Sequence, residues 1–443
     1  MGKEWLSMSA GDLGRGIGAG EIHPVELVEA FLNAIDSHPE AARIYARTTA
    51  ERAHAEAMAS AGRAKAGLRR GPLDGVPISW KDLFDTAGVA TEAGSALLRG
   101  RMPTRDAAVL EVATRAGTVC LGKTHMSELA FSGLGLNPVT ATSPNINFPG
   151  AVPGGSSSGA AASVAFGLAP AAIGSDTGGS VRLPAAWNDL VGLKTTPGRL
   201  SLTGVVPLAE RFDTVGPLCR SVEDCALLVS AMEGVRVPDL AGADLTGKRF
   251  LMLETVALDD LRDAPARGFE AAVALLERAG AVVERRRVPA VTEAMSLAGM
   301  LLTAEAYGIW RDVIEASPDK MYARILDRFR SGAAVSAPDF VAAWRRLDVL
   351  RVEWAGAVAG YDAVILPTSP ILPPDAERLL SDDAYYVSEN LLALRNTRIG
   401  NLFLSCGLTL PTSEPSCGIM FLAPPMAEAA LLRLGAAAEM ALR

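Results

Sequence analysis

Two loops rich in glycine and hydroxyl side chains, joined by one short apolar run, constrain this chain more than any other stretch. They occupy residues 154–184, which read GGSSSGAAASVAFGLAPAAIGSDTGGSVRLP. Glycine beside serine or threonine lets a loop adopt positive φ angles and turn its N–H groups inward, and the hydroxyls are candidate nucleophiles. The run 160–169 predicts a helix whose N-terminus points its free N–H groups at the first loop. We therefore expect both loops to form one site.

The first loop also satisfies G-x-S-x-G, the nucleophile-elbow motif, at residues 155–159. That motif requires a histidine base that follows the serine in the chain. All histidines of this chain precede the loop: His23, His38, His54 and His125. A lysine is the next candidate for a general base that activates a serine. The sequence therefore predicts activation by lysine rather than by imidazole.

Three motifs together resemble the amidase signature family of Ser-Ser-Lys hydrolases: GVPISWKDLFDTAG, GGSSSG and GSDTGGSVRLPAA. Carried over residue by residue, the resemblance implies that Lys81 is the catalytic lysine and Ser180 the nucleophile. It implies that Ser156 is the bridging serine, preceded by a cis peptide bond. The separations of 75 and 24 residues between these positions match the family pattern. The resemblance runs from about Val25 to the C-terminus and weakens after Glu233.

The resemblance implies a mechanism without metal or cofactor. Ser180 attacks an amide carbonyl to form an acyl-enzyme, and Ser156 relays the proton between Ser180 and Lys81. Backbone N–H groups of one turn hold the oxyanion: Thr177, Gly178, Gly179 and Ser180. The apolar neighbours of Lys81 predict burial, which lowers the pKa of a lysine toward the neutral range that a base requires.

The stretch after Lys123 lines the substrate pocket in the resembled family. The resemblance therefore implies substrate contacts from four residues, for which ordinary loop packing is the alternative: Met126, Ser127, Phe131 and Ser132. Residues 141–144 read ATSP where the family usually has a Gly-Thr-Pro-type turn. The implied partner is a small-molecule amide. The particular amide is left open.

Three alternatives accompany this interpretation. The first is the A subunit of a glutamine-dependent tRNA amidotransferase, although the loop MSELAFSGLG does not resemble that of such subunits. The second is a non-catalytic binding protein, which intact Lys81, Ser156 and Ser180 disfavour. The third is a nucleotide-binding protein, because Gly117 to Thr124 reads GTVCLGKT and matches G-x-x-x-x-G-K-[ST]. There a helix is expected before the first glycine and a strand at 118–121, the reverse of what a phosphate-binding loop needs.

Composition narrows the class of protein. Of 443 residues, 49% are hydrophobic and 21% charged, which predicts a large buried core, and a net charge of −8 gives no reason to expect a nucleic-acid partner. No secretory signal and no apolar run of about 18 residues is present, so we expect a soluble, cytoplasmic protein without membrane contact. The five cysteines contain no C-x-x-C pair and are expected to be reduced. A homodimer remains open.

The expected fold is α/β, with a mixed central β-sheet flanked by α-helices, in a single amidase domain over residues 1–443. N-terminal helices are expected at about 24–62, after a flexible lead-in at 11–20. A strand–helix–strand unit followed by helices is expected at about 248–358, and then, at 361–374, a buried strand that runs into a proline-rich loop. Residues 395–412 are expected to supply later core strands before a final helix. One core is expected to draw on both ends of the chain.

Overall fold

One mixed β-sheet of eleven strands forms the centre of the molecule in the computed structural model, which describes residues 4–443. The strand order is β1-β3-β2-β4-β6-β5-β10-β11-β9-β7-β8. The strands are β1 (Tyr45–Thr48), β2 (Pro77–Lys81), β3 (Val119–Thr124), β4 (Ala171–Ser175), β5 (Val191–Lys194), β6 (Val215–Cys219), β7 (Arg249–Leu253), β8 (Val282–Arg286), β9 (Ala363–Pro367), β10 (Cys406–Pro411) and β11 (Gly418–Ala423). Because β10 pairs with β5, the C-terminal strands join the sheet built by the first half of the chain.

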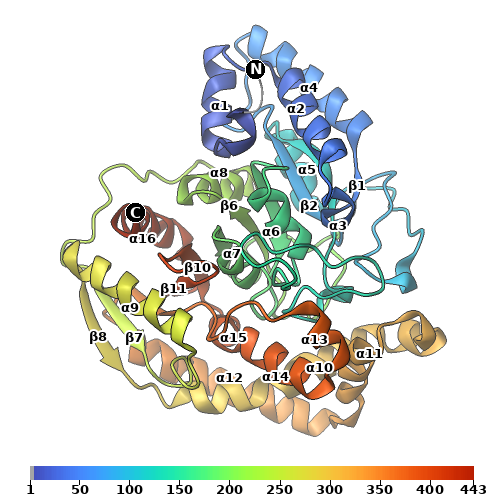
Figure 1. The fold of residues 1–443 in the computed structure, drawn as a ribbon. Coiled ribbons are helices and arrows are strands. Elements are labelled where there is room, and N and C mark those ends of the chain that lie inside the picture. Colours follow the sequence, from blue (N-terminus) through green and yellow to red (C-terminus); the bar gives the residue numbers. More distant parts are fainter. Residues whose placement is uncertain (1–3) are drawn as a thin grey trace.

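Helices surround this sheet (Figure 1), which confirms the predicted fold class. They are α1 (Ala10–Ala19), α2 (Pro24–Ser37), α3 (Ala41–Ile44), α4 (Ala50–Lys65), α5 (Ala108–Arg115), α6 (Ser158–Ala165), α7 (Arg182–Trp187), α8 (Val222–Glu233), α9 (Asp263–Arg278), α10 (Ala290–Ala316), α11 (Ala323–Arg330), α12 (Ala337–Val358), α13 (Ala376–Ser381), α14 (Asp383–Ala393), α15 (Arg395–Leu402) and α16 (Glu428–Leu442). In Figure 1, α1, α2 and α4 lie at the top and α10 and α12 at the bottom, with α6 and α7 between them.

Local sequence signals account for several helix and strand boundaries. Proline occupies the first position of α2, where its missing N–H costs no hydrogen bond. The hydroxyl of Ser221 accepts a hydrogen bond from the N–H of Asp224 at 3.1 Å and so caps α8. The expected strand–helix–strand unit is β7, α9 and β8, and its two strands pair in parallel. The helices expected at 24–62 and 290–358 are present as well.

Two expectations are wrong. The expected flexible lead-in is helix α1, because its glycines allow close packing: a Cβ on Gly14 would lie 2.1 Å from the carbonyl oxygen of Pro72. The N–H of Gly11 also donates to Asp224 at 2.8 Å. The first part of the expected strand region 395–412 is helix α15, and only β10 is a strand. Seven of the eight α15 residues are buried, so packing gives no alternating pattern to distinguish helix from strand.

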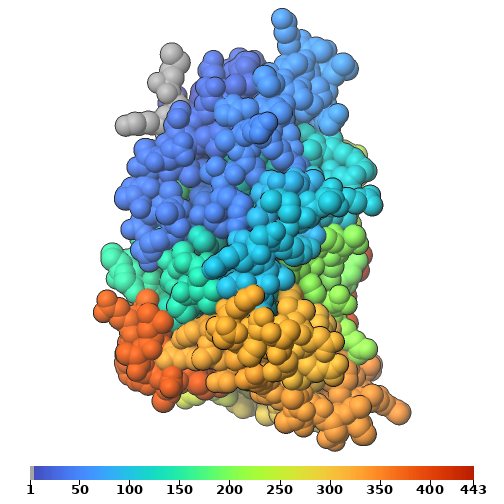
Figure 2. Space-filling view, turned by 90° about the vertical axis from the view of Figure 1, so that its right-hand side faces the viewer, coloured from blue at the N-terminus to red at the C-terminus, as the bar shows by residue number. Residues whose placement is uncertain are grey.

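In the part of the chain from residue 4 onward, no helix is both long and apolar enough to cross a bilayer. The cysteines are all free and buried, as expected for packed thiols. Figure 2 shows the molecule turned by 90°, with N-terminal segments covering the upper part of this face and residues near 300–350 the lower part. The segment near 100 to 150 lies between them. This is the segment that carries the expected substrate-contact residues.

Candidate active site

Two neighbouring parallel strands bring Lys81 to the site. All five residues of β2 are buried, and β2 pairs in parallel with both β3 and β4. Because parallel strands end at the same edge of a sheet, Lys81 at the end of β2 lies beside Ser175 at the end of β4. The Nζ atom of Lys81 donates a hydrogen bond to the Ser175 hydroxyl at 2.8 Å. Strand pairing thus fixes the position of the lysine.

The first hydroxyl-rich loop holds Ser156 against this lysine. Lys81 Nζ donates a hydrogen bond to Ser156 Oγ at 2.7 Å, and the Gly155–Ser156 peptide bond is cis, as the resemblance implies. The loop leads directly into α6, whose small residues let it lie close to neighbouring backbone. A Cβ on Gly159 would come within 2.4 Å of the Ile44 carbonyl oxygen. The small residues of α6 therefore allow the loop that carries Ser156 to pack close to the neighbouring backbone.

Lys81 has the electrostatic setting of a general base. Its side chain is fully buried, and burial lowers its pKa from 10.5 to about 7. The carboxylates of Asp213 and Asp176 act in the opposite direction, since negative charge favours the ammonium form. A base whose pKa lies near the working pH combines a populated neutral form with useful basicity.

Ser180 lies at the end of a tight turn that follows β4. The φ angle of Gly179 is 132°, and a Cβ there would come within 2.0 Å of Thr397 Oγ1, so the turn requires glycine. The carbonyl oxygen of Ser180 accepts a hydrogen bond from the N–H of Ser157 at 3.3 Å. In the described part of the chain, the Ser180 hydroxyl has no hydrogen-bond partner, so its relay contact with Ser156 is not formed here. Catalytic hydrogen bonds commonly tighten only when substrate binds.

The turn also places the backbone N–H groups expected to form the oxyanion hole. Gly179 differs from the other three, because its N–H already donates to Asp176 Oδ1 at 2.8 Å. Among the residues that the structure describes, the N–H groups of Thr177, Gly178 and Ser180 have no hydrogen-bond partner. A Cβ built on Gly178 would meet nothing within 4 Å, so open space adjoins this turn. Three N–H groups are therefore free for an oxyanion.

A buried ion pair shapes the turn. Arg182 donates to the carboxylate of Asp176 through both Nε and Nη2, each at 3.0 Å, and both side chains are fully buried. Burial raises the pKa of Asp176, but the charge and hydrogen bonds of Arg182, the charge of Lys194 and the hydrogen bond from Asn401 together lower the pKa to about 2. Helix α15 adds two contacts: Asn401 Nδ2 donates to Asp176 Oδ1 at 2.8 Å, and Thr397 Oγ1 donates to the Gly178 carbonyl oxygen at 2.8 Å.

A second acid, Asp213, fixes the beginning of the turn. The hydroxyl of Thr177 donates to Asp213 Oδ1 at 2.5 Å, and the backbone N–H groups of Leu208 and Ala209 donate to Oδ2. Burial raises the pKa of Asp213, while these hydrogen bonds act in the opposite direction. Asp213 thus supports the turn formed by residues 177–180 and contributes negative charge near Lys81.

The four expected substrate-contact residues are all buried and divide into two places. Ser127 adjoins Ser156: its N–H donates to the Ser156 carbonyl oxygen at 3.1 Å, and its buried hydroxyl has no hydrogen-bond partner among residues 4–443. The Met126 carbonyl oxygen accepts from Asn137 at 2.8 Å. Phe131 and Ser132 lie farther along, where they contact α11 and α14.

These two contacts are direct. Phe131 packs edge-on against Phe329 of α11 with ring centroids 4.6 Å apart. Ser132 Oγ donates to Asn390 Oδ1 of α14 at 3.2 Å.

The nucleotide-binding alternative is wrong. The match at 117–124 begins after helix α5 and continues into strand β3, so no loop curls between its two glycines. Its lysine, Lys123, is fully buried and donates to the Phe84 carbonyl oxygen at 2.7 Å and to Thr91 Oγ1 at 2.9 Å. In the described residues, no group of three or more His, Cys, Asp or Glu side chains is arranged to hold a metal ion.

Sequence reasoning missed most of the residues that support the site. Ser175, Asp176 and Arg182 all stand within the quoted motif GSDTGGSVRLPAA, so their position beside the expected nucleophile was a usable signal. Thr397 and Asn401 follow more than 200 residues later, and nothing in the local sequence connects them to the turn.

The chain belongs to the Amidase family, whose model matches residues 26–432. It is therefore a hydrolase of the class that cleaves amide C–N bonds. It is 36% identical to 2-amino-5-chloromuconic acid deaminase of Comamonas testosteroni, over 84% of this chain and 83% of the relative. It is 30% identical to the A subunit of the glutamyl-tRNA(Gln) amidotransferase of Thermobifida fusca, over 99% and 97%. The solved peptide amidase of Stenotrophomonas maltophilia superposes with a TM-score of 0.84 at 28% identity, covering 98% of this chain and 97% of that structure.

Proposed function

We propose that this chain, without a partner subunit, hydrolyses a small carboxamide to a carboxylic acid and ammonia or an amine. The proposal depends chiefly on the contact between Lys81 and Ser156. A lysine with a pKa of about 7, bonded at 2.7 Å to a serine hydroxyl, can accept a proton near neutral pH. Ser180 on the adjacent turn then serves as nucleophile.

In the proposed reaction, Ser180 Oγ attacks the carbonyl carbon, and its proton passes through Ser156 to the neutral Lys81. The carbonyl oxygen becomes an oxyanion and accepts hydrogen bonds from the free N–H groups of the turn. When the C–N bond breaks, the proton returns through Ser156 to the leaving nitrogen. Water then attacks the acyl-enzyme by the same relay, which releases the acid and restores Ser180.

Residues 1–443 act as one amidase domain, since α15 and the first-half turn form one site. Ser127 contributes to the substrate pocket directly, while Met126, Phe131 and Ser132 shape it. No metal or cofactor takes part. We place the protein in the cytoplasm, as a monomer or a homodimer.

The test is ammonia or amine release by the purified protein from a panel of aryl, alkyl and amino-acid amides. We expect turnover by the wild type and none by Ser180→Ala. Ser163→Ala is a matched control, because Ser163 is equally buried but its hydroxyl donates to the Ala160 carbonyl oxygen within α6. Equal rates for Ser180→Ala and the wild type would refute the assigned nucleophile.

A second candidate function is the A subunit of a glutamine-dependent tRNA amidotransferase. The observation in its favour is the near full-length similarity to the Thermobifida fusca protein. The same assay distinguishes the two when glutamine is included, with and without partner subunits. Hydrolysis restricted to glutamine and dependent on those subunits would favour this candidate and leave the roles of Lys81, Ser156 and Ser180 unchanged.

A further inference from the structure

The peptide unit between Gly178 and Gly179 is held at both of its polar ends. Its carbonyl oxygen, on Gly178, accepts a hydrogen bond from the hydroxyl of Thr397 at 2.8 Å. Its N–H, on Gly179, donates to Asp176 Oδ1 at 2.8 Å. These two groups point in opposite directions in a planar trans peptide, so the two hydrogen bonds together fix the orientation of the whole unit.

The direction of the free N–H groups in the turn depends on this unit. The next peptide unit has its carbonyl oxygen, on Gly179, bonded to the N–H of Leu183 at 2.8 Å. Its N–H, on Ser180, points the opposite way and has no hydrogen-bond partner among residues 4–443. Because the two units share the Cα atom of Gly179, rotation of the first unit changes the direction of the Ser180 N–H.

Two consecutive glycines give the turn little resistance of its own to such a rotation, since glycine adopts positive and negative φ angles about equally well. The resistance must therefore come from the groups that bind the unit. Asp176 holds the N–H end and belongs to the same turn. The carbonyl end accepts from Thr397 alone in the described part of the chain, and Thr397 follows Gly178 by 219 residues.

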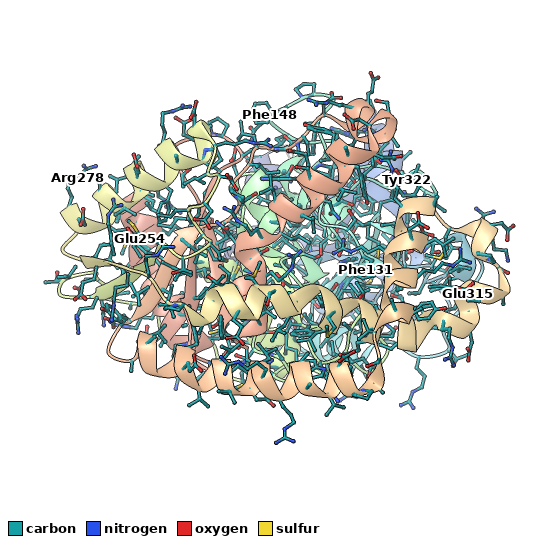
Figure 3. The ribbon with its side chains drawn as sticks, turned by 90° about the horizontal axis from the view of Figure 1, so that it is seen from below. Phe131, Phe148, Glu254, Arg278, Glu315 and Tyr322 are labelled. Carbon is teal, nitrogen blue, oxygen red and sulfur yellow. The ribbon has the colours of Figure 1, made fainter. Side chains whose placement is uncertain are left out.

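Helix α15 holds Thr397 firmly enough for this task. The Thr397 side chain is fully buried. Asn401, four residues later on the same face, donates to Asp176 at 2.8 Å and accepts from Arg182 at 2.7 Å. At the start of the helix, the side-chain amide of Asn396 donates to two backbone carbonyl oxygens at 2.8 and 2.9 Å. Figure 3, which looks from below, shows the salmon-coloured ribbon of α14 and α15 crossing the middle of the molecule.

The start of α15 also packs against both glycine-containing loops of the site. A Cβ on Gly179 would lie 2.0 Å from Thr397 Oγ1 and 2.9 Å from Leu394 Cδ2. A Cβ on Gly133 would lie 2.4 Å from Leu394 Cγ. The carbonyl oxygen of Gly133 in turn accepts from the N–H of Gly155 at 2.6 Å, next to Ser156. Little space is therefore left for the Gly178–Gly179 unit to turn while Thr397 is in place.

We propose that Thr397 is a positioning residue for amide hydrolysis. Its hydroxyl holds the Gly178–Gly179 peptide in one orientation, and that orientation directs the free N–H groups of the turn toward the oxyanion. Donors that are already aligned stabilise the developing charge without reorganising during the reaction. Thr397 acts through the turn and not on the substrate, and its assignment rests on the proposed attack by Ser180.

The first test measures kcat and KM of Thr397→Val for an amide that the wild type hydrolyses. This change replaces the hydroxyl by a methyl group of similar size and leaves the Gly178 carbonyl oxygen without a donor. We expect kcat to fall about 10- to 100-fold with KM changed less than about threefold, because the lost alignment matters chiefly in the transition state. Thr397→Ser keeps the hydroxyl and should recover most of kcat. An unchanged kcat in Thr397→Val, or no recovery in Thr397→Ser, would overturn the proposal.

Thr49→Val is the matched control. The Thr49 hydroxyl is buried as well and donates to the Cys120 carbonyl oxygen at 2.8 Å, the same length as the bond from Thr397. Cys120 pairs with Ile78 near the start of β2, whereas Lys81 is the last residue of that strand. Both valine variants should lose a similar amount of thermal stability, and only Thr397→Val should lose kcat. An equal loss of kcat in Thr49→Val would reduce the effect to general destabilisation and overturn the proposal.

The second test requires no amide turnover and follows covalent labelling by an alkyl fluorophosphonate with intact-mass measurement. Ser180 Oγ attacks phosphorus, the P–O bond forms, the P–F bond breaks and fluoride leaves, while the serine proton passes through Ser156 to Lys81. The phosphonyl oxygen occupies the place of the oxyanion, so the labelling rate depends on the same N–H groups. We expect equal rates in the wild type and Thr49→Val, a rate at least about tenfold lower in Thr397→Val, and no label in Ser180→Ala.

The labelling result separates this inference from the proposed function. A wild type that is labelled but hydrolyses none of the amides would count against the proposed function alone, and a slower Thr397→Val would still support the positioning role. Equal labelling rates in the wild type and Thr397→Val would overturn the positioning role whatever the amide assay shows. A wild type that takes no label at Ser180 would overturn both.

Discussion

The lowered pKa of Lys81 predicts a specific dependence of amide hydrolysis on pH. A fall from 10.5 to about 7 means that the buried ammonium form is disfavoured by about 5 kcal/mol. At pH 7, about half of the molecules would then carry a neutral Lys81, whereas an ordinary lysine would be neutral in about one molecule in 3,000. If Lys81 is the base, as proposed, its burial therefore accounts for most of the neutral form present at pH 7.

The pKa of Lys81 also determines how the rate of hydrolysis should change with pH. Because the neutral fraction falls about tenfold for each pH unit well below the pKa, kcat/KM should drop about 50-fold between pH 7 and pH 5. It should rise only about twofold between pH 7 and pH 9, where the base is already neutral. The profile of kcat/KM reports the free enzyme, so its inflection near pH 7 belongs to Lys81 in the unbound site.

The assay is initial-rate hydrolysis of one neutral amide in buffers of constant ionic strength from pH 5 to 10. A neutral substrate has no titrating group of its own, so it adds no inflection to the profile. Lys123→Met is the matched control, since Lys123 is also fully buried but lies in β3 and bonds to Phe84 and Thr91. The inflection should persist in this variant at whatever level of folded protein remains. A flat profile, or an inflection near 10.5, would refute the assignment of Lys81 as base.

Three further predictions concern stability. In Asp176→Asn, the buried Arg182 loses its partner, so urea titration should show a loss of about 3–5 kcal/mol in unfolding free energy, and a loss below 1 kcal/mol would contradict this account. In Gly179→Ala, the unfolding free energy should fall by about 1–3 kcal/mol, because residue 179 has a φ of 132°. In Gly178→Ala, the unfolding free energy should stay unchanged, because the new Cβ would lie in open space. Lys81 has a lower pKa in the folded chain, so the wild type gains stability as pH rises from about 7 to 10.5. The unfolding free energy of Lys81→Met minus that of the wild type, measured by urea titration, should therefore be highest below pH 7 and should fall as the pH rises toward 10.5. A difference that does not change with pH would contradict the lowered pKa of Lys81.

The three residues expected to act in catalysis were accessible from sequence because each stands within a short motif of fixed composition. The motifs do not show, however, that these three residues lie close together in space. Lys81 meets Ser175 because β2 and β4 are parallel neighbours, and strand order is not encoded in either segment alone. Asn401 illustrates the limit further, since its contact with Asp176 joins residues 225 apart.

Helix α1 and helix α15 show why two local assignments failed. Glycine lowers helix propensity, so a segment with four glycines resembles a flexible loop. The close approach of Gly14 to Pro72 reverses that preference, because only a residue without a side chain fits there. In α15, burial on nearly every side removes the amphipathic period that would distinguish a helix. Tertiary packing determined both elements, and packing is the information that a single sequence lacks.

The place of β10 in the sheet has a consequence for biosynthesis. Strand β5 is complete by residue 194, yet its second neighbour β10 is made only at residues 406–411. While the ribosome translates the intervening 211 residues, β5 presents an unpaired apolar edge, the kind of surface that pairs with other chains. Helix α15, which anchors the catalytic turn, emerges just before β10. A nascent chain thus carries its whole triad, complete by Ser180, long before β10 is available to close the sheet beside β5.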